Sequence, residues 1–205
     1  MHTQFREQAT RTARGAGVIA WVGFGIGAAH VGLVILILGG SILTDPGGWT
    51  GIGLTLAWLV PALALAALAL LRPTVAVPLL AVLTLLPVGM GFWSLVDYQG
   101  ARDWEDSHGP ISLVFLVVVA AGLVVLGLAR PTTAGVLLLV ATVAPAALAM
   151  IGAGSDWFDP LSISLVTAPL VAAGVLYVVA GVRRSRTSDA GPAEPLPRRS
   201  DSRAG

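Results

Sequence analysis

Six long apolar runs, each bounded by charged residues, proline or glycine, constrain the fold of this chain more than any other feature. The runs cover Gly17–Leu43, Gly51–Leu71, Thr74–Val96, Ile111–Ala129, Thr132–Gly152 and Leu161–Val182. A helix of about 20 apolar residues is long enough to cross a bilayer. Soluble domains carry about 25% charged residues, whereas this chain has 11% charged and 56% hydrophobic residues. We therefore predict an all-α, multi-pass membrane bundle of six transmembrane helices.

The first run follows three arginines, a pattern that also begins secretory signal peptides. Its apolar stretch of about 27 residues is longer than the 7–15 residues of a typical signal core, so we interpret it as a retained helix. The chain then divides into a basic N-terminal segment, residues 1–16, a transmembrane domain, 17–182, and an Arg-rich tail, 183–205. We predict a disordered tail because it lacks apolar periodicity. The N-terminal segment either lies on the anionic inner leaflet or is flexible.

The distribution of arginine predicts the orientation. All 12 basic residues are arginines. They lie before the first run, between the second and third, between the fourth and fifth, or after the sixth, and only Arg102 lies in one of the other connections. The arginine-rich set includes Arg72, between the second and third runs, and Arg130, between the fourth and fifth. Because basic residues stay on the cytoplasmic side, both termini are predicted to be cytoplasmic. The absence of Lys and the abundance of Ala, Gly and Val favour a bacterial cell (inner) membrane.

Two stretches of the sequence repeat each other 58 positions apart. "LLRPTVAVPLLAVLTLLP" at 70–87 and "LARPTTAGVLLLVATVAP" at 128–145 agree at ten of eighteen positions. The shared Arg-Pro-Thr predicts a tight turn, because the residue before proline leaves the helical region and proline suits the first helical position. We interpret the chain as three tandem two-helix hairpins, which are parallel repeats of about 58 residues related about the membrane normal.

Prolines inside the runs predict bends in the helices. Pro87 and Pro145 each follow a threonine by three residues, Thr84 and Thr142, in the repeated stretch. Proline frees one carbonyl and kinks a helix, and a nearby threonine can help to satisfy freed backbone groups. Either these are tolerated membrane prolines, or matched kinks open a shared cavity that Thr84 and Thr142 line. Further kinks are expected at two other prolines, Pro61 and Pro169.

His30 is the only ionisable residue deep in any run, and an ionisable residue at membrane depth is a candidate functional site. It could ligate haem or a metal, relay protons or bind a ligand, and it also counts as a candidate cavity-lining residue. No second His and no acid lies at membrane depth, so a neutral His bonded between helices is the interpretation we favour. We expect no cofactor and no metal site.

Small residues in the first run predict close helix packing. Gly23 and Gly27, and likewise Ala28 and Gly32, are spaced as small-x-x-x-small pairs, which serve either internal contacts or contacts with another copy or membrane protein. The connection at 97–108 gathers four acids and His108, and either binds a divalent cation or is simply solvated.

No catalytic motif is present in the sequence, and no catalytic residue is assigned. General acid–base catalysis needs titratable groups near the substrate, and transporters coupled to ions ordinarily carry buried charges. We therefore expect a non-enzymatic structural, assembly or regulatory membrane component, in contact with the lipid bilayer and not with nucleic acid. The alternative is a small permease or channel-like protein for an uncharged or apolar solute. A membrane enzyme or haem protein centred on His30 ranks third.

Overall fold

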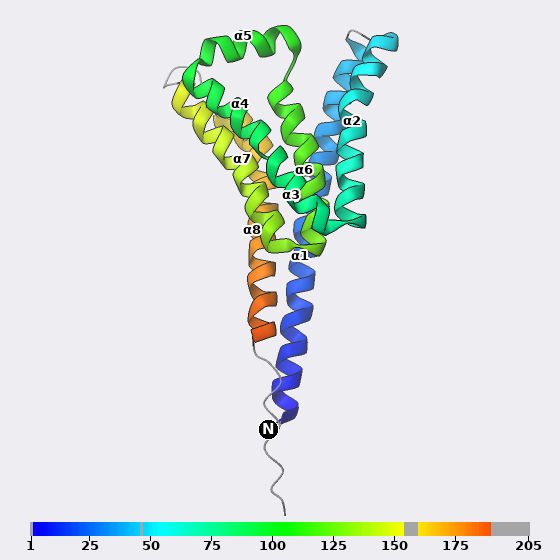
Figure 1. Ribbon diagram of the computed structural model, residues 1–205, viewed down its shortest axis with the longest axis vertical. Coiled ribbons are helices and arrows are strands. Elements are labelled where there is room, and N and C mark those ends of the chain that lie inside the picture. The colour runs from blue at the N-terminus through cyan, green and yellow to red at the C-terminus, as the bar shows by residue number, and fades with distance from the viewer. Residues whose placement is uncertain (1, 46, 154–159, 190–205) are drawn as a thin grey trace, which may run out of the picture.

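The computed structural model describes residues 2–45, 47–153 and 160–189, and every element in these ranges is an α-helix (Figure 1). In chain order the helices are α1 (His2–Thr44), α2 (Gly48–Leu71), α3 (Pro73–Leu83), α4 (Leu85–Val96), α5 (Tyr98–His108), α6 (Ile111–Ala129), α7 (Pro131–Ala153) and α8 (Pro160–Asp189).

Within the described ranges, six helical spans are long and apolar enough to cross a membrane. They are Gly15–Thr44, Gly48–Leu71, Pro73–Val96, Ile111–Ala129, Pro131–Ala153 and Leu165–Arg186. Each span overlaps one of the six apolar runs. The prediction of an all-helical, multi-pass membrane protein is confirmed at this level.

Apolar side chains also cover the outside of the bundle. Leu36, Leu71 and Leu165 each expose more than 70% of their surface. Patches of this extent are rare on monomeric soluble proteins, whereas a bilayer accommodates them at no cost. The chain is therefore an integral membrane protein whose outer surface faces lipid.

Helix α6 occupies the middle of the bundle and is its most apolar span. It packs against α1, α2 and α7 and also contacts α3, α4 and α8. Half of its apolar stretch is buried, against 22 to 33% for the other spans. From Leu113 to Ala129 it carries no polar side chain. Around it, α1 packs against α2 and α8, α8 against α7, and α7 against α4.

The third span is interrupted and is followed by a short connecting helix. A turn at Thr84 separates α3 from α4, three residues before Pro87. Helix α5 crosses one end of the bundle between α4 and α6 (Figure 1). We call this the α5 end, and we call the opposite end, with the turns at Arg72 and Arg130, the arginine end.

Helices α1 and α8 extend past the rest of the bundle at the arginine end (Figure 1). Helix α1 begins at His2, so the described part of the basic segment 1–16 continues the transmembrane helix without a break. Helix α8 continues to Asp189, beyond the predicted end of the sixth run at Val182. Residues 190–205 of the tail, where we predicted disorder, lie outside the described residues.

The three hairpins do not take equivalent positions in the bundle, and tandem repeats of about 58 residues are not confirmed. Helix α6 of the second hairpin is central, whereas its counterparts in the other hairpins, α2 and α8, lie at the periphery. Helix α4 packs along α7, but no comparable packing joins α7 to α1 in the described part of the chain.

Candidate functional site

The two Arg-Pro-Thr turns at the arginine end have the same backbone geometry. Arg72 has φ −139° and ψ 66°, and Arg130 has φ −131° and ψ 68°. Each backbone N–H donates to the carbonyl four residues earlier, Leu68 or Leu126, at 2.8 Å. The next helix begins at the following proline, where the missing N–H is not needed. The side chains of both arginines are exposed.

Thr84 and Thr142 also have matching environments. They are 2% and 1% exposed, and each hydroxyl donates to the carbonyl four residues earlier at 2.7 Å, Leu80 for Thr84 and Leu138 for Thr142. The carbonyls that lose their helical donors to Pro87 and Pro145 are those of Leu83 and Ala141, four residues before each proline. The hydroxyls therefore do not satisfy the freed carbonyls. Threonine bonds of this kind themselves bend helices.

The four prolines predicted to bend helices occupy different surroundings. Pro61 lies inside α2 and is exposed, Pro87 is buried in the first turn of α4, and Pro145 and Pro169 are half-buried inside α7 and α8. Pro78, inside α3 and exposed, belongs to the same group, although we did not select it from the sequence.

His30 lies on α1 and is half-buried, with Nε2 buried and unbonded. Helices α1 and α8 pack closely at Gly27 and Ala173, where a Cβ built on the glycine would lie 3.5 Å from that of the alanine. Helices α1 and α8 run antiparallel. His30, three residues after Gly27, therefore lies near the level of Leu170, three residues before Ala173. Helix α1 has no comparable packing against α3, α4 or α7 among the described residues. The structure therefore does not bring His30 together with Thr84 and Thr142.

Two further buried polar atoms without a hydrogen-bond partner lie one turn apart on α2. They are the Thr55 hydroxyl and the Trp58 indole Nε1, and Trp58 is only 7% exposed. Leaving a donor unsatisfied costs about 1–3 kcal/mol. We did not select either residue as a site; from the sequence, Trp58 is expected only to pack between helices or to face lipid.

The small residues of α1 divide into two groups. Gly23 and Gly27 are buried inside the bundle, against Leu176 and Tyr177 at the first and Val124 at the second. Ala28 and Gly32 are half-buried, and a Cβ on Gly32 would meet nothing within 4 Å. Only the second group leaves room for a neighbouring helix.

Tyr177 makes a long-range side-chain hydrogen bond in the bundle interior that we did not predict from the sequence. The side chain is fully buried, and its hydroxyl donates to the Val124 carbonyl on α6 at 2.6 Å. The ring lies over Gly127, where a Cβ would fall within van der Waals overlap of the ring carbons. The signal in the sequence that could have indicated this contact is a tyrosine at the same predicted membrane depth as a glycine of another span.

The acidic connection at 97–108 is mostly helix α5. The Asp97 carboxylate accepts from the Gly100 N–H at 2.9 Å and caps α5, and the Glu105 carboxylate accepts from the Ser112 N–H at 2.9 Å at the start of α6. Both placements suit the positive N-terminal end of a helix. His108 stacks on Trp104 with ring centroids 5.0 Å apart. Among the described residues, no three His, Asp or Glu side chains group as metal ligands.

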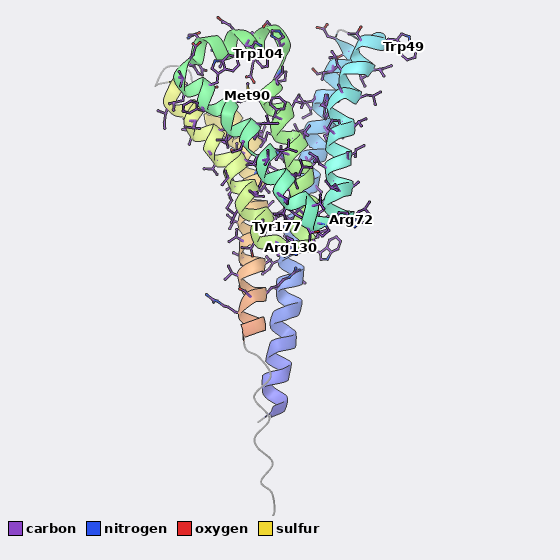
Figure 2. The ribbon with its side chains drawn as sticks, viewed as in Figure 1. Trp49, Arg72, Met90, Trp104, Arg130 and Tyr177 are labelled. Atoms are coloured by element: carbon purple, nitrogen blue, oxygen red, sulfur yellow. The ribbon has the colours of Figure 1, made fainter. Side chains whose placement is uncertain are left out.

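Tryptophans mark both ends of the bundle. Trp49 and Trp104 lie at the α5 end (Figure 2), and Trp104 also contacts Trp93 at a centroid distance of 5.5 Å. Trp21, nearer the arginine end of α1, is 63% exposed. This distribution is typical of the aromatic belts at membrane interfaces.

No known family model matches the chain, and no curated protein or solved structure is significantly similar to it.

Proposed function

We propose that this integral membrane protein is a non-catalytic structural, assembly or regulatory component of a bacterial cell membrane, with its arginine end in the cytoplasm. The apolar α6 carries this proposal, because it fills the centre of the bundle with side chains that can neither bind an ion nor transfer a proton. Thr84 and Thr142, which could have offered hydroxyls to a solute, are bonded to their own helices.

We also propose that α3–α4 and α7 descend from one duplicated segment. The two Arg turns have similar dihedral angles, and both threonines donate to the carbonyl four residues earlier. The helices run in parallel at matching depth, since Gly91 lies against Pro145 and Gly152 lies against Ser94. The different surroundings of the remaining helices would then reflect divergence after the duplication.

A partner helix is proposed to pack on the uncovered face of α1. Gly23 and Gly27 are occupied by α8 and α6, so the contact would use Ala28, Gly32 and their exposed neighbours Gly25 and Ala29. Small residues allow two membrane helices to approach closely. A second copy of the chain is the simplest partner to test.

The absence of cysteine makes this contact testable by crosslinking. Single-cysteine variants Ala29→Cys and Gly32→Cys, oxidised in native membranes, are expected to give disulfide-linked dimers. Ala20→Cys is the matched control, since Ala20 is buried within the bundle and should remain monomeric. Equal crosslinking of all three variants, or of none, would rule out a specific contact between copies on this face.

The alternative is a small permease for an uncharged solute, and the unpartnered atoms of His30, Thr55 and Trp58 favour it. The rate of solute uptake distinguishes a permease from a non-catalytic component. Liposomes that contain the purified protein should take up glycerol and urea no faster than protein-free liposomes in a stopped-flow light-scattering assay. Uptake that is several-fold faster, and is reduced in Thr55→Val, would replace the non-catalytic proposal by the permease.

A further inference from the structure

The two exposed arginines of the Arg-Pro-Thr turns end neighbouring helices. Helices α2 and α6 pack side by side and run in the same direction, and a Cβ on Gly122 would lie 3.2 Å from that of Leu65. Arg72 and Arg130 follow these two contact residues by seven and eight positions. The two turns are therefore at the same depth. Since packed helix axes lie about 8–10 Å apart, their guanidinium groups can reach one headgroup.

Within residues 15–45, 47–153 and 165–186, no acidic residue lies at the arginine end. Among residues 15–45, 47–153 and 165–186, the acids are Asp45, Asp97, Asp103, Glu105 and Asp106. All of them follow or precede spans at the α5 end. Figure 2 shows Arg72 and Arg130 together at the opposite end, below the labelled Trp104 and Met90. Within these residues the bundle supplies no anion at the arginine end, which leaves the surrounding lipid as a source.

The position of the turns limits what that anion is. Each arginine immediately follows an apolar helix, α2 or α6, and its side chain is exposed. This depth corresponds to the headgroups of the adjacent leaflet, where phosphodiesters are the abundant anions. Guanidinium groups bind phosphate through two parallel hydrogen bonds, which a point charge cannot do.

We propose that Arg72 and Arg130 together bind the headgroup of one anionic phospholipid that carries two phosphodiester groups, with one guanidinium on each phosphate. The proline after each arginine fixes the turn, so both arginines are held in place before the lipid arrives. A lipid with a single phosphate would pair with only one of the two arginines. The site does not depend on the proposed function, because it uses neither the face of α1 nor the interior of the bundle.

Lipid binding to the full chain tests this site. The purified protein in detergent is titrated with cardiolipin, phosphatidylglycerol or phosphatidylcholine, and bound lipid is counted by native mass spectrometry. Wild-type protein should retain one cardiolipin in preference to two phosphatidylglycerols, and phosphatidylcholine should not compete. Inorganic phosphate at about 10 mM should not displace the lipid, because it lacks the acyl chains that also bind to the apolar surface of the helices.

Substitutions locate the binding. Arg72→Gln and Arg130→Gln are each expected to weaken cardiolipin binding about fivefold, as expected for one arginine at an anionic surface. The matched control is Arg102→Gln at the α5 end, which should bind as wild type does. Wild-type binding by both variants, an equal loss in Arg102→Gln, or equal affinity for phosphatidylglycerol per phosphate would overturn the proposal. Far-ultraviolet circular dichroism confirms that each variant is folded.

Discussion

The hydroxyl of Tyr177 on α8 donates a 2.6 Å hydrogen bond to the carbonyl oxygen of Val124 on α6. The acceptor lies in the central helix and the donor in a peripheral one, so this bond fixes α8 against the middle of the bundle. Both groups are buried, and the ring beneath the hydroxyl fills the space left by Gly127.

Substitution of Tyr177 should separate the hydrogen bond from the packing. Tyr177→Phe removes the hydroxyl and should lower the free energy of unfolding by about 0.6–1.7 kcal/mol, the range for side-chain hydrogen bonds in membranes. Tyr177→Ala also leaves a cavity and should cost about 3–5 kcal/mol. Unfolding in mixed micelles measures both. Tyr98→Phe, in the half-buried start of α5, serves as the control, and a loss there as large as in Tyr177→Phe would contradict the assigned role.

Two glycines on α4 should respond in opposite directions to the same substitution. A Cβ on Gly91 would lie 2.5 Å from the Cα of Pro145, which is backbone and cannot yield, whereas a Cβ on Gly89 meets nothing within 4 Å. Gly91→Ala should therefore destabilise the protein by about 1–3 kcal/mol. Gly89→Ala should stabilise it by about 0.5–1 kcal/mol, because alanine favours a helix interior. Equal midpoints of thermal unfolding for the two variants would show that α4 and α7 lie farther apart than the close approach of Gly91 to Pro145 implies.

Two threonine-to-valine substitutions should change the free energy of unfolding differently, because one hydroxyl is hydrogen-bonded and the other is not. Thr142→Val removes a bonded hydroxyl and should cost up to about 1 kcal/mol, because the Leu138 carbonyl loses one donor. Thr55→Val removes a buried hydroxyl that has no partner, and should be neutral or stabilising by about 1 kcal/mol. The two variants are compared by chemical unfolding in the same detergent. A clear loss in Thr55→Val would reveal a partner for that hydroxyl in the membrane.

Accessibility of single cysteines should report the orientation. Ser107 and Thr74 are both exposed, at the α5 end and the arginine end respectively. If the arginine end is cytoplasmic, an impermeant maleimide should label Ser107→Cys on intact cells and Thr74→Cys only after the membrane is opened. The reverse pattern would invert the topology. Because the native chain has no cysteine, the unsubstituted protein is the blank.

The transmembrane spans could be predicted from the sequence because an apolar run of this length has one stable outcome in a bilayer. The turns at Arg72 and Arg130 were predictable for a similar reason, since arginine followed by proline ends one helix and begins the next. These features depend on neighbouring residues in the chain and on the solvent, and not on the packing of the bundle.

The choice of neighbouring helices could not be predicted in the same way. Between membrane helices there is no hydrophobic driving force, and shape complementarity decides which surfaces meet. The contact of Tyr177 with Gly127 and that of Gly91 with Pro145 depend on single positions without periodicity. For this reason we grouped His30 with Thr84 and Thr142 by their predicted membrane depth alone. In the structure, α6 lies between α1 and the helices that carry the threonines.

The packing of α1 against α8 also sets an order of events during biogenesis. The two helices lie at opposite ends of the described chain, and α8 and α6 cover the surface of α1 around Gly23 and Gly27. While the ribosome is still making the intervening spans, that surface must face lipid or an insertion factor. The contact between α1 and α8 can therefore form only after the last span has been made, and in a chain that stops before α8 the face of α1 at Gly23 would lack this neighbour.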